Sequence, residues 1–444
     1  MNSPDDIPVV APPLPAASVD LAVIAAEAAA PPTELPKVSA RYIWLLVIAQ
    51  FGVFMAFITP LAISLAIRVN ALAPGHEEYL GYITGVGALV VMFTGPFLGV
   101  ASDRTRTRLG RRRPFIIVGM LLGVVSLLVM ALAPSVMVLG LGWILAQLGW
   151  GQTLGGLSNS QADRLPESQR GKVAGLGGLA TQIAPVFGVV IAGGLSGNPL
   201  LLFLIPGLVG VIAVLLFVIF VHEDDSRGLR FADRLTVKTL LAKYVFNPRK
   251  FPDFSWNWLG RFLFYFGLTL NTTFTAFFFA SRMGVSVDKV GGVIAAAGGI
   301  GVLATTIGAI GGGFLSDKIK RRKPFVVLSG ALMAVGMLTM AFSTALPVLI
   351  AGSLIVSLGL GGFAAVDQAL LLDVLPERET DAGRYMGIVG FATSIPQAVA
   401  PLIAPLFLAI GIAAGGKNYT LLFIVAAACV LLGGIVILRI RSVR

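Results

Sequence analysis

The sequence predicts an all-α membrane protein with twelve transmembrane helices. Hydrophobic residues make up 56% of the 444 positions, charged residues only 12%, and the mean hydropathy is +0.89. The 53 glycines suit helices that pack closely in lipid. The charge is gathered in short stretches, of which "SDRTRTRLGRRRPF" (102–115) holds six arginines. This stretch lies between two uncharged runs, 81–101 and 115–133, each able to cross about 30 Å of hydrocarbon.

Each apolar run is predicted to form one helix, and the residues before the first run form a separate tail. Residues 1–36 are rich in Pro and Ala and lack the basic start of a secretory signal, so we expect a disordered cytoplasmic N-terminal tail. Prolines inside the runs, such as Pro60, Pro185 and Pro401, are expected to kink helices whose freed carbonyls find partners on neighbouring helices. The predicted helices occupy residues 42–67, 80–101, 115–133, 136–160, 173–195, 199–221, 254–280, 290–315, 325–343, 347–372, 385–411 and 419–438.

The distribution of Lys and Arg predicts the orientation. Loops on one side of the predicted spans hold 28 of these residues, whereas the other side holds Arg68, Arg282, Lys289 and Lys417. Basic loops stay in the cytoplasm, so both termini are expected there, in a multi-pass protein of the cytoplasmic (inner) membrane. The formal charge of +11 is therefore interpreted as a topology signal, and no nucleic-acid partner is expected.

Several function classes are disfavoured by missing motifs. The sequence has no G-x-x-x-x-G-K-[ST] loop for ATP, no H-E-x-x-H, and no convergent catalytic set, so an ATP-driven motor or an enzyme is not expected. No cofactor or metal is implied. The single cysteine, Cys429, lies in an apolar run and is interpreted as a packed hydrophobe. A non-transporting membrane sensor remains a minor alternative.

An internal repeat predicts two halves in the same orientation. The segment "GVASDRTRTRLGRRRPF" (99–115) recurs as "GFLSDKIKRRKPF" (313–325), and "ADRLPESQRGK" (162–172) recurs as "LDVLPERETDAGR" (372–384). We therefore expect two six-helix parallel pseudo-repeats, the arrangement of a rocking secondary transporter. Their predicted limits are 37–221 and 254–444, the second with a short basic tail, joined by a cytoplasmic linker at 222–253.

The first basic loop resembles the loop signature of the major facilitator superfamily. The residues that carry the resemblance, which extends over 40–440, are Gly99, Asp103, Arg104, Gly110, Arg111 and Arg112. The long loop form, "FGVFMAFITPLAISL" (51–65) and "GWILAQLGWGQTLGGLSNSQAD" (142–163) resemble the sucrose and glycoside to proton symporter branch. The resemblance implies alternating access, a small-molecule substrate, protons as the coupling ion, and a monomer in the lipid bilayer.

The sequence departs from the plant-type members of this branch. Those members carry an aspartate and an arginine in the fourth span, where this chain has Ala146 and Ser158. Their mechanism does not carry over, and the chain looks more like bacterial members. Proton-coupled uptake of a sugar or glycoside is the expected function. The alternative is proton-driven export of drugs or metabolites, which Pro185 and Gly188 of the fifth span match loosely.

The loop residues are predicted to form a conformational latch. Asp103, at the end of the second span, can pair with an arginine or meet a helix N-terminus of the other half when the cytoplasmic side is closed. Gly99, Arg104 and Arg112 belong to the same predicted latch, with Asp317 as the counterpart in the second half. The alternatives are that the arginines only anchor the loop at anionic headgroups, and that Gly99 only permits close helix contact.

Two ionisable residues lie well inside the predicted spans. The resemblance places the first, fourth, seventh and tenth spans around a central cavity, and ionisable groups there are functional by default. Arg261 lies about 10 Å and Asp367 about 9 Å from the cytoplasmic ends of the seventh and tenth spans, at 1.5 Å per residue. We expect them to pair and to couple transport to protons. A fixed structural ion pair is the alternative.

Small or neutral polar residues on the cavity-lining spans and on span 11 are candidate substrate ligands. On the fourth span they form one stripe at helical spacing. Each can instead serve helix packing. The candidates are Gln50, Gln147, Gly151, Ser158, Tyr265, Asn271, Gln368 and Gln397.

Overall fold

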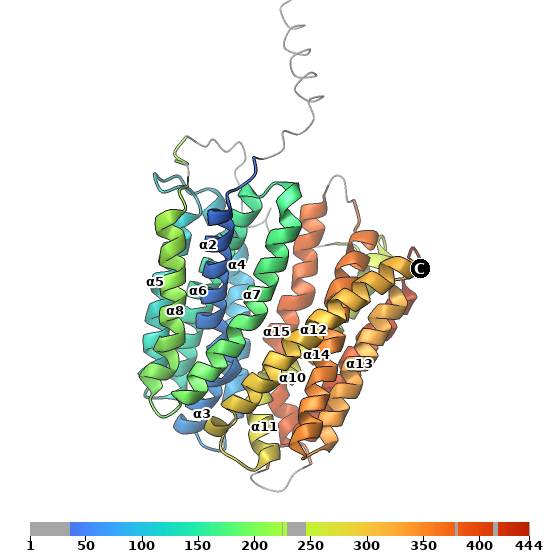
Figure 1. Ribbon diagram of the computed structural model, residues 1–444. Coiled ribbons are helices and arrows are strands. Elements are labelled where there is room, and N and C mark those ends of the chain that lie inside the picture. Colours follow the sequence, from blue (N-terminus) through green and yellow to red (C-terminus); the bar gives the residue numbers. More distant parts are fainter. Residues whose placement is uncertain (1–35, 224, 229–245, 378–380, 412–415, 444) are drawn as a thin grey trace, which may run out of the picture.

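The computed structural model describes residues 36–223, 225–228, 246–377, 381–411 and 416–443. The predicted tail at 1–36, apart from its last residue, and most of the predicted linker at 222–253 lie outside the described residues. Helices dominate what is described, and they form two groups that stand side by side (Figure 1).

The first group contains the helices α2–α8 and the π-helical segment η1, which begin and end close to the predicted apolar runs. Helix α2 continues through the π-helical segment η1 into α3, so the three elements make one long rod. The bounds of all elements in the first group are α2 Ala40–Thr59, η1 Pro60–Ser64, α3 Leu65–Leu72, α4 Glu78–Asp103, α5 Arg113–Ala131, α6 Val136–Arg164, α7 Glu167–Gly194 and α8 Pro199–Phe220.

The second group contains α10–α16. Helices α10 and α11 meet at a bend of 50°. The bounds are α10 Pro252–Thr273, α11 Thr275–Met283, η2 Val287–Lys289, α12 Gly291–Ile319, α13 Lys323–Phe342, α14 Leu346–Val374, α15 Ala382–Ala409, α16 Tyr419–Val436 and η3 Ile437–Arg439.

Local sequence explains where many of these helices start. Side-chain oxygens of Ser39, Ser135, Asn198 and Asn418 accept hydrogen bonds from the first backbone N–H groups of α2, α6, α8 and α16. Proline stands in the first turn of α5, α8 and α13, where its missing N–H costs nothing. The proline at the predicted kink Pro60 opens the π-helical segment, which is a common way for a helix to absorb an irregularity.

Ten helices of the described residues are long and apolar enough to cross a membrane, or eleven if the bent pair α10–α11 is one span. Helix α6 is not among them, although its 29 residues are long enough. It carries Gln147, Gln152, Thr153, Ser158 and Asn159 along its length, and polar residues lower its hydropathy.

Packing follows the same pattern in both groups. Helices α5 and α6 contact each other as α13 and α14 do, and α2 packs on α8 as α10 packs on α16. Close approach depends on glycines: Gly149 lies against Gly123 in the first group, and Gly352 against Gly336 in the second.

The two groups meet through α4 with α15 and through α7 with α12. We call the end with loops 104–112 and 320–322 the basic end, and the end with loops 73–77 and 284–290 the far end. In Figure 1 the groups converge at the far end, which lies at the bottom of the view. There Gly193 lies against Gly291, with 3.2 Å between an added Cβ and the Gly291 Cα.

Toward the basic end the same helices pack more loosely. On α7, a Cβ at Gly171, Gly175 or Gly178 would meet no atom within 4 Å. On α4 and α15, Gly99 and Gly390 are equally open. The seam between the groups is therefore closed at the far end, and its helices have open space beside them toward the basic end.

Candidate functional site

A buried ion pair joins α10 to α14 in the second group. Arg261 Nε lies 3.4 Å from Asp367 Oδ2. The Asp367 side chain is 1% exposed, and the Arg261 side chain 13%. A carboxylate so far from water is stable as an anion only with a partner, so the arginine is what permits its charge. The two residues that the sequence placed at one depth are thus adjacent.

Asn257 belongs to this group of residues, and the sequence analysis missed it. It lies one turn before Arg261 on α10, is fully buried, and adjoins the Asp367 carboxylate. Among the described residues, neither polar atom of its side chain has a hydrogen-bond partner, and the same holds for Asp367 Oδ1. The four-residue spacing from Arg261 was the available signal, because residues at i and i+4 share a helix face.

Apolar and aromatic residues surround the pair. On the side of the basic end, Phe254, Leu371, Tyr385 and Ile388 belong to one buried cluster, to which Trp258 is joined by its Nε1–H donating to the Ile388 carbonyl at 3.0 Å. On the other side, the Arg261 guanidinium lies over the Tyr265 ring, 5.8 Å from its centre. This predicted substrate residue is therefore adjacent to the predicted coupling pair. The surroundings have low polarity, which strengthens electrostatic interactions within the site.

The other predicted substrate residues lie at several places in the two groups. Gln147 and Gly151 line a pocket of about 220 Å³ between α4 and α6, together with Gly99. Asn271 lines a second pocket, of about 260 Å³, in the other group. Gln50 donates to Gln161 Oε1 at 3.0 Å, which joins α2 to α6. Three further candidates are exposed: Ser158, Gln368 and Gln397.

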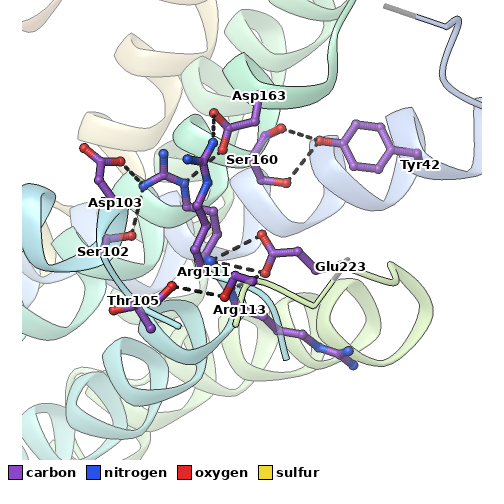
Figure 2. Close-up of polar contacts among 11 residues, drawn as sticks. Tyr42, Ser102, Asp103, Thr105, Arg111, Arg113, Ser160, Asp163 and Glu223 are labelled. Carbon is purple, nitrogen blue, oxygen red and sulfur yellow. Dashed lines mark hydrogen bonds and ion pairs between the residues drawn. The ribbon is translucent and has the colours of Figure 1, made fainter. Parts of the chain in front are cut away.

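Two of the predicted latch residues, Asp103 and Arg112, belong to a polar network at the basic end (Figure 2). Arg112 lies at its centre and is 5% exposed. Its Nη1 contacts Asp103 Oδ1 at 2.5 Å and donates to Ser102 Oγ at 3.1 Å, and its Nε donates to Asp163 Oδ2 at 3.0 Å. Arg111 adds a contact of 2.9 Å to Asp163. The network ties the ends of α4, α5 and α6 together.

The second group repeats this arrangement. Arg322 Nη1 lies 3.2 Å from Asp317 Oδ1, and Arg322 Nε donates to Asp373 Oδ2 at 2.5 Å. In each group the arginine precedes a helix and bridges the ends of the helices on either side. Asp103 thus bonds an arginine of its own group here. A latch across the two groups stays a prediction for a state in which their basic ends approach.

Glu223 is a second residue that the sequence analysis missed. Its carboxylate accepts the backbone N–H of Arg113 at 2.7 Å and that of Arg112 at 3.2 Å, so it caps the N-terminus of α5. Gly110 has φ +85°, and an added Cβ there would lie 2.5 Å from Glu223 Oε2. Ser226 accepts from the Thr107 N–H at 2.9 Å, so the chain after α8 is bound to the loop.

The long apolar helices of this fold are those of a multi-pass membrane protein, and the comparisons with known proteins give its family. The family model for the Major Facilitator Superfamily matches residues 43–322 and 292–444. The chain therefore belongs to the major facilitator superfamily. It is a multi-pass membrane transporter of that family and not an enzyme.

Individual relatives resemble the chain in fold or over part of its length. A mutant of the nucleoside transporter NupG has a TM-score of 0.73 at 12% identity, over 90% of this chain and 99% of that one. A bacterial homologue of the human lysosomal transporter Spinster, in an inward-facing and unoccupied conformation, has a TM-score of 0.65 at 17% identity, over 91% and 99%. The General alpha-glucoside permease of Schizosaccharomyces pombe (strain 972 / ATCC 24843) is 33% identical over 117 residues, 25% of this chain and 20% of the permease. The chain thus matches about one fifth of that relative.

Proposed function

We propose that the protein is a proton-coupled symporter that takes up a sugar or glycoside by alternating access. The observation that carries the proposal is the buried pair of Arg261 and Asp367 between α10 and α14. Both histidines, His76 and His222, lie outside the helices, so we assign the proton to the buried carboxyl group of Asp367. The partial match to a glucoside permease supports a sugar as substrate.

The proposed architecture is twelve spans in two parallel repeats, 37–221 and 254–444, with the linker 222–253 between them. The matched Arg112 and Arg322 networks support the repeat, because each ties equivalent helix ends together. Helix α6 is proposed as a span despite its polar residues, since it packs against both α4 and α5. The protein is proposed to work as a monomer.

The proposed orientation places the basic end in the cytoplasm, together with both chain termini. The excess of Lys and Arg in the loops of this end supports it. The seam closed at the far end then corresponds to a transporter shut toward the outside. In this proposal the Asp103 and Asp317 networks regulate closure of the cytoplasmic side, with Gly99, Arg104 and Arg112 as parts of the latch.

In the proposed coupling step, the Asp367 carboxylate is neutralised alternately by Arg261 and by a proton. With Arg261 beside it, the carboxylate is charged and paired. When α10 shifts against α14 and Arg261 moves away, an isolated anion with 1% exposure is costly, so the carboxylate takes a proton. The Asn257 amide suits both states, because its N–H donates to a carboxylate and its carbonyl accepts from a carboxylic acid.

The test is Asp367→Asn in proteoliposomes, with Glu167→Gln as the matched control. The amide mimics a permanently protonated carboxyl, so we expect loss of disaccharide accumulation driven by a pH gradient, while counterflow of radiolabelled disaccharide persists. Glu167 is an exposed carboxylate in the first turn of α7, and its variant should accumulate substrate normally.

Two results would contradict the proposal. Accumulation by the Asp367→Asn variant with unchanged pH dependence would make the pair structural. Dye efflux driven by protons, without disaccharide counterflow in the parent protein, would favour the alternative, a proton-driven exporter of drugs or metabolites.

A further inference from the structure

An ion pair joins the two groups at the far end. Lys417, in the segment before α16, lies 2.6 Å from Glu78 Oε2 at the start of α4. The other oxygen of Glu78 bonds His76 Nδ1 at 2.8 Å. Both oxygens of this carboxylate are therefore occupied. Because the two chain segments belong to different groups, separating the groups at the far end must break the contact with Lys417.

A second carboxyl group, that of Glu77, lies next to this ion pair and is not part of it. Glu77 precedes α4 directly, and its Oε2 is buried without a hydrogen-bond partner among the described residues. Burial, with the Glu78 charge as a smaller cause, raises the pKa of Glu77 to about 7, while Lys417 opposes the shift. Glu77 therefore exchanges a proton near neutral pH.

The other charged groups of the far end have partners of their own or lie on η2. Arg68 donates to the Ala133 carbonyl, and Arg282 donates to the Ala341 carbonyl and to Thr420. Asp288 and Lys289 belong to η2, which packs on α3. Lys417 is thus the cation that acts on Glu77, and Glu78 is the anion.

The two groups also touch close to Glu77. One turn into α4, Gly81 lies directly against the Pro401 carbonyl of α15, and an added Cβ at Gly85 would lie 2.7 Å from the Ala398 carbonyl. Opening the far end would pull α4 from α15 and expose the segment before α4.

We propose that Glu77 is a proton-sensitive switch of the seam at the far end, and that a proton bound there favours the closed seam. The proposal goes beyond symport and needs no substrate. A proton stabilises whichever state binds it more tightly, and here that is the closed state. If opening returns the pKa of Glu77 from about 7 to its ordinary 4.5, the ratio of closed to open protein rises about tenfold between pH 8 and pH 6.

The test measures closure directly by a distance between two spin labels. Ala71→Cys on α3 and Thr344→Cys in the loop before α14 place one exposed label on each group. Cys429→Ala removes the native thiol, which is the single cysteine of the chain. Distance distributions in lipid nanodiscs at pH 6 and pH 8 then give the closed and open populations.

Three protein forms separate the outcomes. The parent should show about ten times more of the closed form, relative to the open form, at pH 6 than at pH 8. Glu77→Gln, a permanently neutral mimic, should give the same ratio of closed to open protein at both pH values, and this ratio should exceed that of the parent at pH 6. His76→Gln removes the imidazole that also changes charge in this range, and its pH response should persist. An unchanged ratio in the parent, or a normal pH response in Glu77→Gln, would overturn the switch.

Discussion

Replacing Gly110 by alanine tests how the chain after α8 holds the first basic loop. Gly110 and Gly75 both have left-handed backbone, with φ +85° and +79°. An added Cβ at Gly75 meets nothing within 4 Å, whereas at Gly110 it would lie 2.5 Å from Glu223 Oε2. Both alanine variants thus place alanine in the left-handed backbone conformation, which costs free energy of folding. Only the variant at Gly110 also brings a methyl group into collision with Glu223.

The difference between the two variants can be worked from the contacts. Left-handed backbone costs alanine about 1 kcal/mol at either position. At Gly110 the displaced carboxylate also loses its bonds to the N–H groups of Arg112 and Arg113, and hydrogen bonds to charged groups contribute about 1.5 to 3 kcal/mol each. Because Glu223 is partly exposed, we take about 2 kcal/mol for the two together.

Hydrogen exchange of the peptide spanning residues 106–116 measures this loss locally. About 2 kcal/mol corresponds to roughly 30-fold faster exchange of the capped amides. We expect this acceleration in Gly110→Ala, with little change in Gly75→Ala. Equal exchange of this peptide in the two variants would show that Glu223 does not hold the start of α5, and the capping argument would fail.

Two further variants test other contacts. Asp103→Asn removes the charge beside Arg112 and should slow conformational exchange, which a transport-rate measurement would detect. Ligand affinity in detergent should stay nearly intact. Loss of affinity with a normal transport rate would refute the latch. Gly188→Ala would drive a methyl group into the Thr59 side chain and should lower stability by about 1 to 3 kcal/mol. Gly178→Ala, on the same helix with open space around it, should not lower the melting temperature in detergent, and equal melting temperatures would contradict the packing argument.

Much of the helical layout follows from the sequence because membrane helices must be apolar over a fixed length. The predicted run 80–101 became Glu78–Asp103, and 136–160 became Val136–Arg164. The helices extend beyond the runs because charged ends reach water without leaving the helix. The π-helical segment at Pro60 and the bend after Thr273 depend on neighbouring helices, and no pattern in the sequence indicated their form.

The candidate site was predictable from the sequence where only the depth of a residue along its helix determines which residues lie at the same level. Arg261 and Asp367 were placed together because rise per residue fixes their level on two helices. Asn257 and Glu223 were missed because their roles depend on which helix faces meet and on how a loop folds back. Whether the predicted substrate residues share a cavity depends on how the two groups are arranged, which no single helix encodes.

The contact of Gly193 with Gly291 has a mechanical consequence. From this contact, α7 runs 26 residues to Glu167, or about 39 Å at 1.5 Å per residue. Two helices whose backbones touch at one end, with no side chain between them, can rotate against each other about that contact as a pivot. A rotation of about 10° around such a point moves the opposite end of α7 by about 7 Å. A methyl group at either glycine would displace this pivot, and the resulting displacement of α7 would be largest at the end farthest from the contact.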